Sequence, residues 1–565
     1  MRRAPPCSVA VVYLAACAGG SPAQGAGNPA DMILKNAAIY TVDAGRSWAT
    51  AVAIRQGRIA YVGSDSIPRD LLGSDTEVMD LRGRMVLPGF QDGHVHPIDG
   101  GVTLGECTLD ELTTPGQIAD SIRSCVTTQR QAVWVRGSGW QLPVFPAGNP
   151  SKVVLDQIIP DRPAIFVAAD GHSAWVNSRA LRLAGITRDT PDPSDGRIER
   201  DGRTGEPSGT LREEAMDLVY RVVPERTREE LAAGLARAQK LANSFGITSV
   251  LDASVDEAGL RTYAATDRGG ALTLRVVAAL NLGQPLVDSS LPKLRDLRAK
   301  FATTRVRPIA VKLFADGVIE ARTAALLAPY RDRQGDPGKP IYDEIALKNL
   351  AAALDRNGFQ IHVHAIGDRA IRMTLDAFAF ARSQNGARDA RHTITHLELI
   401  DSADIPRFRS VGAVASFQAL WANGDEYLLK LTEPTLGPAR SRWLYPMASM
   451  ARAGATLAGG SDWSVSSLNP LEAIEVGITH RPPDHPAQAA WHPAERVDIA
   501  TMIAMYTINA AFAMRQERET GSIEVGKSAD LIVLDRNLFE IEPAEIHEVK
   551  VLRTLLEGQT VFESK

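Results

Sequence analysis

The 565-residue sequence lacks several features that would point to particular classes of protein. Acidic and basic side chains nearly balance, 67 against 62, so the formal net charge is −5 and no basic stripe suggests nucleic-acid binding. We find no internal repeat and, beyond a short N-terminal tether, no low-complexity tract. The apolar run from Val9 to Ala16 is too short to span a bilayer permanently. With 44% hydrophobic residues, the chain instead has enough apolar material for one large domain and an accessory domain.

Cysteine is also scarce, with four residues in the whole chain. Cys7 and Cys17 lie in the N-terminal segment, so only Cys107 and Cys125 belong to the part that is predicted to fold. In an oxidising compartment these two could form a disulfide, but their separation in sequence cannot establish the geometry. A disulfide and two isolated thiols are both open at this point.

The N-terminal segment has the pattern of an export signal. Arg2 and Arg3 precede the apolar run, which has the length of a signal-peptide core. The stretch Leu14-Ala15-Ala16-Cys17 resembles a bacterial lipobox, in which a diacylglycerol is attached to the cysteine and a signal peptidase cleaves before it. Residues 18–30 are rich in small residues and in proline, which is typical of a flexible tether.

We therefore expect residues 1–17 to be a signal peptide with a lipobox, and Cys17 to be the lipid attachment site of an exported protein. Such a protein would be a membrane-anchored lipoprotein in a bacterial periplasm. The same stretch, read as Ala16-Cys17-Ala18, also fits ordinary secretion, after which the protein would be periplasmic or secreted. No membrane contact is expected except through this anchor.

Short strand patterns lie at both ends of the remaining chain. Residues 31–84 contain four short apolar runs, and residues 520–565 contain three more. Strands at both ends of a chain, around a long α/β middle, predict a small β-sandwich that is built from the two termini.

The middle of the chain, residues 85–519, alternates between apolar strand candidates and helical patterns. Eight such strands predict a (β/α)8 TIM barrel, whose chemistry lies at the carboxyl ends of the strands. The eight candidates are Met85 to His96, Ile247 to Asp252, Leu274 to Leu280, Pro308 to Phe314, Phe359 to His364, Thr393 to His396, Gly412 to Phe417 and Thr456 to Asp462.

One further strand candidate, Ala164 to Ala169, does not fit the count of eight. It lies in a gap, about residues 101–225, that is far longer than an ordinary connection in a barrel. We interpret this gap as a subdomain that is inserted after the first barrel strand and lies over the mouth of the active site.

Several of the predicted strands end in side chains that bind metals. His94 and His96 lie one residue apart, so side-chain alternation turns them to the same side of the first strand. His364, His396 and Asp462 close three other strands. Imidazole nitrogen and carboxylate oxygen are the ligands of catalytic zinc, which keeps an open position for water. The pattern therefore predicts a metal site at the mouth of the barrel.

Beyond these residues, the sequence resembles the amidohydrolase superfamily, specifically its amidohydrolase 3 branch, which includes N-substituted formamide deformylases. The resemblance covers about residues 31–562. It rests on the stretches Pro88-Gly89-Phe90-Gln91-Asp92-Gly93-His94-Val95-His96, Asp170-Gly171-His172-Ser173-Ala174-Trp175-Val176-Asn177-Ser178, Lys312-Leu313-Phe314-Ala315-Asp316-Gly317, His364-Ala365-Ile366-Gly367-Asp368-Arg369-Ala370, Thr395-His396 and Gly460-Ser461-Asp462-Trp463. It implies hydrolysis of C–N bonds other than peptide bonds, with one or two divalent metals, usually Zn²⁺.

The resemblance also implies roles for the metal ligands. His94, His96 and Asp462 would bind the more buried metal, and His364 and His396 would bind the second. Lys312 stands where many relatives carry a carbamylated lysine that bridges both metals. From the residues alone, Lys312 is a lysine in an apolar strand, and a buried amine paired with a carboxylate such as Asp316 is the alternative.

Further residues are candidates for catalysis or for binding of the substrate. Asp462 would take the proton of the attacking water and pass it to the leaving nitrogen. His172 would polarise the substrate carbonyl, and Asn177 belongs to the same motif; a structural role is the alternative. Arg322 would hold an anionic or carbonyl group of the substrate, unless it forms a salt bridge to Asp316 or Glu320. His362 shares a face with His364 and is either a support for the ligands or a core histidine.

Two stretches depart from the family pattern. The chain has Thr395-His396-Leu397-Glu398 where many relatives have Glu-His-Ala-Gln, and Ser416-Phe417-Gln418-Ala419 where many have Ser-x-Gln-Pro. The ligands survive, but the pocket wall differs, so the small-molecule substrate is not identified. Ester hydrolysis and deamination on the same scaffold are alternatives, as is a surface binding protein without activity. The oligomeric state is open.

Overall fold

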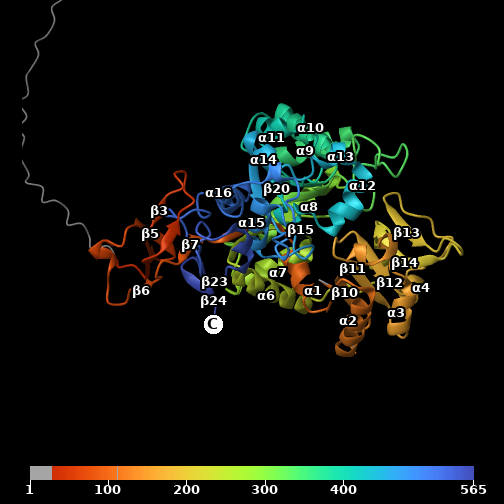
Figure 1. Ribbon diagram of the computed structural model, residues 1–565, viewed down its shortest axis with the longest axis horizontal. Helices are drawn as coiled ribbons and strands as arrows, with labels where there is room; N and C mark the ends of the chain where they lie inside the picture. The colour runs from red at the N-terminus through yellow and green to blue at the C-terminus, as the bar shows by residue number, and fades with distance from the viewer. Residues whose placement is uncertain (1–27, 111, 131, 565) are drawn as a thin grey trace, which may run out of the picture.

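The computed structural model describes residues 28–110, 112–130 and 132–564 (Figure 1). The predicted signal peptide, the lipobox at Cys17 and most of the tether lie outside the described residues. The described chain forms a parallel barrel, a β-sandwich from both termini and an inserted subdomain. None of its described helices is long and apolar enough to cross a membrane.

The central sheet has eight parallel strands that follow one another in chain order. Its first and last strands also lie against each other. The backbone N–H of Asp462, just after the last strand, donates to the carbonyl of His94 in the first at 2.7 Å. This confirms the predicted (β/α)8 barrel. The strands are β8 (Phe90–Val95), β15 (Ile247–Val255), β16 (Arg275–Leu280), β17 (Val306–Phe314), β18 (Gln360–Ala365), β19 (Thr393–His396), β20 (Val414–Phe417) and β21 (Thr456–Gly459).

Amphipathic helices separate the strands and bury their apolar side against the sheet. In α9, for example, Leu347, Leu350 and Leu354 are buried, and Asp343 caps the first turn through backbone N–H groups. The helices of the barrel are α1 (Pro97–Thr103), α6 (Arg228–Ser244), α7 (Glu257–Arg268), α8 (Leu291–Phe301), α9 (Glu344–Arg356), α10 (Asp368–Asn385), α11 (Ile405–Val411) and α14 (Met447–Arg452), followed by α15 (Pro470–Thr479), α16 (Ile499–Met505) and α17 (Ile508–Ala513).

The first predicted strand, Met85 to His96, is two strands in the structure, and the prediction of one strand is wrong. β7 (Met85–Pro88) belongs to the sandwich, and only β8 enters the barrel. Pro88 has no N–H to continue a ladder. At Gly89 the chain passes so close to β15 that a Cβ atom would lie 2.4 Å from Thr248 Oγ1. The chain therefore leaves the sandwich sheet and enters the barrel sheet at Pro88 and Gly89.

The sandwich consists of two sheets whose facing apolar side chains form one core, including Leu34, Ile54, Val86 and Val533. Strands from both termini share the larger sheet, as predicted, and in Figure 1 red and blue segments meet there. The smaller sheet has the order β5 (Arg58–Gly63), β4 (Ala51–Arg55), β1 (Met32–Lys35), β6 (Glu77–Asp80); the larger has β24 (Gln559–Glu563), β23 (Val551–Leu556), β22 (Leu531–Leu534), β7, β2 (Ala38–Tyr40), β3 (Trp48–Ala49).

The inserted subdomain follows the first barrel strand, as predicted, and has a six-stranded sheet of its own. The extra strand candidate, Ala164 to Ala169, is β11 of this sheet. In Figure 1 the subdomain lies on the other side of the barrel from the sandwich. Its strands run in the order β13 (Gly196–Arg200), β14 (Pro207–Glu213), β12 (Ser173–Val176), β11 (Ala164–Ala168), β10 (Val135–Trp140), β9 (Cys107–Thr108), with helices α2 (Pro115–Thr128), α3 (Lys152–Ile158), α4 (Ser178–Leu183) and α5 (Asp217–Tyr220).

A disulfide joins Cys107 to Cys125, with their Cα atoms 5.6 Å apart. It links β9 to α2 and so decides between the two states that the sequence left open. Both residues pack in the core of the subdomain.

Candidate metal centre and its pocket

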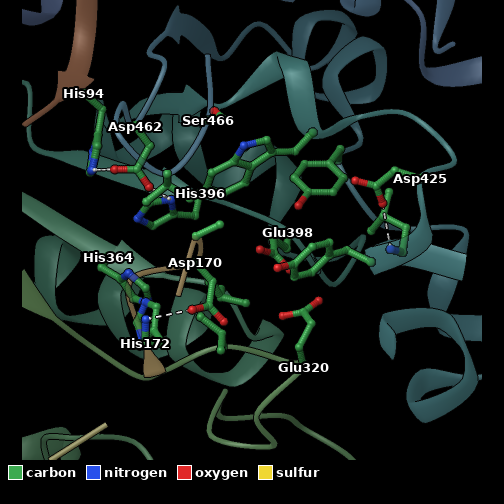
Figure 2. A pocket seen from close by; sticks show the side chains of 18 of the residues that line it. His94, Asp170, His172, Glu320, His364, His396, Glu398, Asp425, Asp462 and Ser466 are labelled. Carbon is green, nitrogen blue, oxygen red and sulfur yellow. Dashed lines mark hydrogen bonds and ion pairs between the residues drawn. The ribbon is translucent and has the colours of Figure 1, made fainter. Parts of the chain in front are cut away.

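The carboxyl ends of three barrel strands bring His94, His396 and Asp462 together (Figure 2). Each of these buried side chains offers one ligand atom, and the three atoms lie within 4.8 Å of one another. His94 Nε2 is 3.2 Å from Asp462 Oδ1, and His396 Nδ1 is 3.8 Å from Asp462 Oδ2. Asp462 itself follows β21 in a backbone conformation with φ of 55°, which turns its carboxylate toward the histidines.

His96 also lies next to the carboxylate of Asp462. Its Nε2 lies 3.1 Å from Asp462 Oδ1, because strand alternation places it on the same side of β8 as His94. His364, at the end of β18, packs its ring against that of His396 with ring centroids 4.5 Å apart. All four predicted histidine ligands therefore lie around Asp462 or next to a histidine that does.

The second nitrogen of most of these rings is held by another group. His94 Nδ1 is 2.7 Å from His362 Nε2, and His396 Nδ1 is 2.9 Å from Gln418 Oε1. His364 Nε2 is 3.1 Å from the carbonyl of Gly317. A partner on one nitrogen fixes the orientation of an imidazole and leaves the other nitrogen for a metal.

The electrostatics fit a divalent cation. Burial, together with the nearby Lys312, lowers the pKa of His94 to about 3, so its imidazole is neutral. Burial alone would raise the pKa of Asp462, but His94 and His96 bring it well below its usual value. His94 Nε2 is buried and lies 3.2 Å from Asp462 Oδ1, but it forms no well-aligned hydrogen bond among the described residues. The neutral imidazole of His94, with a buried nitrogen facing the ionised carboxylate of Asp462, fits a donor set for zinc or a similar ion.

Lys312 lines the same pocket from β17 and is 2% exposed. Burial lowers its pKa to about 8. Asp316, the alternative partner, instead accepts backbone N–H groups of Ala325, Ile366 and Gly367 at 2.9 to 3.0 Å. Among the described residues, Lys312 Nζ has the ring of Phe314 at 4.6 Å and no ion-pair partner.

His172 reaches the pocket from the inserted subdomain, and its ring lies 5.6 Å from that of His364. Its Nδ1 is 2.8 Å from Glu213 Oε2, and Glu213 Oε1 accepts a hydrogen bond from Thr323 Oγ1 at 2.7 Å. Burial alone would lower the pKa of His172, but Glu213 raises it to about 9. The imidazole is therefore cationic at neutral pH. Glu213 was missed in the sequence, where nothing marks it.

Two predicted substrate-binding residues do not line this pocket. Arg322 donates to Asp332 Oδ2 from Nε and Nη2, at 2.9 and 2.7 Å. Asn177 caps α4 through the N–H of Ala180 and donates its amide hydrogens to the carbonyls of Ile159 and Arg162. In place of the expected substrate contacts, both side chains therefore have structural partners.

The pocket above the metal ligands has a volume of about 340 Å³. Loops that follow the barrel strands and the subdomain form its wall, which agrees with the usual position of a barrel active site. Sequence reasoning missed most of this wall, because only the carboxyl ends of the strands could be assigned. The pocket residues that were not predicted are Gln141, Ala169, Asp170, Phe314, Val318, Glu320, Ile366, Glu398, Trp421, Asp425, Tyr427, Leu428, Tyr445, Val465 and Ser466.

A model of the amidohydrolase family matches residues 77–562, which include every residue of this centre. The chain belongs to this amidohydrolase family. It is a hydrolase of a metal-dependent family, and the cluster around Asp462 is its candidate metal centre.

Several proteins are similar to this amidohydrolase over nearly its whole length. It is 31% identical to Protein LONG AFTER FAR-RED 3 of Arabidopsis thaliana, over 95% of this chain and 92% of that protein. It is 29% identical to the N-substituted formamide deformylase of Arthrobacter pascens, over 94% and 98%. An uncharacterized metal-dependent hydrolase from Pyrococcus furiosus has a similar structure, with a TM-score of 0.70 and 25% identity over 90% of this chain and 99% of that one.

Proposed function

We propose that this amidohydrolase hydrolyses an amide-type C–N bond, other than a peptide bond, in a small molecule. The observation that carries the proposal is the convergence of His94, His396 and Asp462 at the base of a pocket of about 340 Å³. A pocket of this size suits a small ligand. The similarity to a formamide deformylase over 94% of the chain supports an amide-type bond.

Zn²⁺, one ion or two, is the cofactor that we propose from the donor set. When bound, such an ion supplies a Lewis acid and lowers the pKa of a water molecule toward about 7. His94, His96 and Asp462 would hold the more buried ion, and His364 and His396 the second. Lys312 would bridge the two as a carbamate, because it is buried without an ion-pair partner among the described residues.

The protein's own residues supply the proton transfers and the polarisation. Asp462 Oδ is ionised, so it takes a proton from the attacking water and holds it for the leaving nitrogen. His172 is cationic and faces the pocket, so it donates a hydrogen bond to the substrate carbonyl oxygen as negative charge develops there. The inserted subdomain thus completes the site.

Metal analysis of the purified protein, followed by turnover of a substrate panel, tests this proposal. The panel contains N-formyl amines, N-acyl amino acids, the matched esters, and aminopurines for deamination. We expect bound zinc and release of an amine from a formyl or acyl amide, both lost in His94→Ala. If the protein hydrolyses esters or deaminates aminopurines but cleaves no amide, the assignment of an amide substrate is wrong. If the purified protein holds no metal and cleaves nothing in the panel, the proposal of a metal-dependent enzyme is wrong.

We also propose that the protein is exported and anchored to a membrane by a lipid on Cys17. The disulfide between Cys107 and Cys125 supports export, since disulfides persist in oxidising compartments. Labelled palmitate should enter the wild-type protein and not Cys17→Ser. Equal labelling of both, or a mature N-terminus at Gly19, would contradict the anchor.

A further inference from the structure

The pocket has an acidic end that the proposed hydrolysis does not use. Four carboxyl side chains line it: Asp170, Glu320, Glu398 and Asp425. They come from four places, namely the end of β11 and the loops after β17, β19 and β20. Figure 2 shows Glu320, Glu398 and Asp425 on one side of the pocket and His94 with Asp462 on the other. The acidic end is thus apart from the candidate metal centre.

Among the described residues that line the pocket, positive charge comes only from Lys312 and from His172, which lies beside Asp170. Of the described residues that line the pocket, Lys312 is the only lysine or arginine, and it lies on β17 by the candidate metal centre. Glu398 is 6% exposed, and its Oε2 has no hydrogen-bond partner among the described residues. Asp170 Oδ2 is also buried and has no hydrogen-bond partner among the described residues. Buried carboxylate oxygens without partners are costly, so these atoms favour a ligand that brings hydrogen-bond donors or positive charge.

The other two carboxyl groups are fixed in place by the protein. Glu320 accepts a hydrogen bond from Thr432 Oγ1, and Asp425 accepts one from the backbone N–H of Leu428 at 2.9 Å. Burial raises the pKa of Asp425 to about 6, so it is still ionised at neutral pH. Burial also raises the pKa of Glu320, and burial together with Glu320 raises the pKa of Glu398 well above its usual value. The acidic end therefore combines the ionised Asp425 with carboxyl groups that are held in a fixed arrangement.

Aromatic side chains lie next to these carboxylates. Trp421, Tyr427 and Tyr445 line the same pocket. Trp421 stacks on His396 with an interplanar angle of 2°, so its ring lies beside the metal ligands. Tyr427 accepts a hydrogen bond from the backbone N–H of Leu142, which holds its ring in place. Aromatic faces together with carboxylates are the surroundings in which proteins hold organic cations.

A bare metal ion fits this end poorly. A metal would need at least three ligand atoms close together, and among the described residues only His94, His396 and Asp462 meet a limit of 4.8 Å. The four carboxylates are too widely spaced for one ion. A larger cation, such as an alkylammonium or a guanidinium group, can contact several of them at once.

We propose that the substrate carries an organic cation, which the acidic end binds through Glu320, Glu398 and Asp425 while the scissile amide lies at His94 and Asp462. This inference rests on the proposed function for the position of the amide. The binding of the cation itself does not depend on which bond is cleaved.

Hydrolysis of two matched amides is the first test. N-acetylcadaverine and N-pentylacetamide have the same amide and nearly the same chain, and only the first ends in an ammonium group. We expect kcat/KM to be more than about tenfold higher for the cationic amide. Glu398→Gln and Asp425→Asn should each reduce this ratio by about tenfold or more, because each removes a carboxyl group that can contact the ammonium.

Glu426→Gln is the matched control. Glu426 is adjacent to Asp425, but it is exposed and pairs with Lys430 outside the pocket. This variant loses the same charge from the same loop and should keep the wild-type ratio. A wild-type ratio near one, or an equal fall of the ratio in Glu426→Gln, would overturn the inference.

A binding measurement separates this inference from the proposed function. Pentyltrimethylammonium has no amide and no lone pair for a metal, so calorimetry with it reports the acidic end alone. We expect binding to the metal-loaded wild type that weakens about tenfold or more in Glu398→Gln and Asp425→Asn. If no amide is cleaved but the cation binds the wild type more tightly than the two variants, the acidic end is a cation site and the proposed function is wrong. Equal affinity of wild type and both variants, or no binding to any of them, would overturn it.

Discussion

His94 and His362 form a hydrogen bond between two buried imidazole rings, with His94 Nδ1 2.7 Å from His362 Nε2. Only one of these nitrogens can carry the proton. When His94 Nε2 offers its lone pair to a metal, Nδ1 of the neutral ring must hold the proton and donate it to His362. Of the two roles that the sequence left open for His362, this hydrogen bond favours support of the ligand His94 over a purely structural core histidine.

We expect His362→Ala to weaken metal binding about 10- to 100-fold, because His94 then loses the acceptor that orients it. His362→Gln is the matched control, since its amide oxygen can still accept the hydrogen bond from His94 Nδ1 and this variant should retain most of the affinity. Titration against a competing chelator measures both. Unchanged affinity in His362→Ala would show that His94 needs no such partner.

Asp462→Asn should affect turnover more than metal content. The amide keeps the size of the side chain but does not accept a proton, so we expect kcat to fall by roughly two to four orders of magnitude while most of the metal is retained. Metal analysis and steady-state kinetics on the same preparation give both quantities. If the metal-loaded variant turns over within about threefold of the wild type, Asp462 is a ligand alone.

Lys312 should carry a carbamate in the metal-loaded enzyme. A free ammonium group next to two dications would be strongly disfavoured, and its pKa of about 8 leaves part of the amine neutral for reaction with CO₂. Lys312→Ala should lose metal and activity, with partial rescue by short carboxylic acids. Electron density for an unmodified amine at full metal occupancy would refute this assignment.

The pair of His172 and Glu213 should set the basic limb of the pH profile. The pKa of His172 is raised to about 9, so its cationic form is complete at low pH and is lost as the pH rises through that value. We expect kcat/KM to fall near pH 9 in the wild type. In Glu213→Gln the limb should move down toward pH 6.5, the ordinary value for histidine.

The ion pair of His172 and Glu213 should also stabilise the folded protein more at low pH than at high pH. The stability that it contributes is fully present below about pH 6.5 and is lost as the pH rises through about 9. The difference in unfolding free energy between the wild type and Glu213→Gln should therefore shrink over this range. A pH profile of activity that is identical in the two proteins would exclude a cationic role for His172.

Much of the barrel could be predicted because its strands are apolar runs that end in ligands. Side-chain alternation alone was enough to place His94 and His96 on one side of β8. The sequence could not show the change of sheets at Pro88 and Gly89, because the apolar run continues across both. The pairing of β7 with β2 on one side and with β22, from the far end of the chain, on the other assigns Met85–Pro88 to the sandwich.

The pocket wall was less accessible to sequence reasoning than the metal ligands. Glu320, Glu398 and Asp425 lie in loops, and their proximity depends on how those loops fold over the barrel. A motif also does not determine the direction of every side chain in it. Asn177 belongs to the same motif as His172, yet it points into the subdomain and caps α4. Arg322 similarly turns to Asp332.

The pairing of β7 with β22 has a consequence for how the protein folds. Leu87 faces Ile532, so two strands that are neighbours in the sheet are separated by most of the chain. Contacts of such long range slow folding, because the loop between them must be ordered first. During synthesis β7 keeps an unpaired edge until β22 has been made, and such edges favour aggregation. Since β8 follows β7 directly, the strand that carries His94 reaches its final support only after nearly the whole chain has been made.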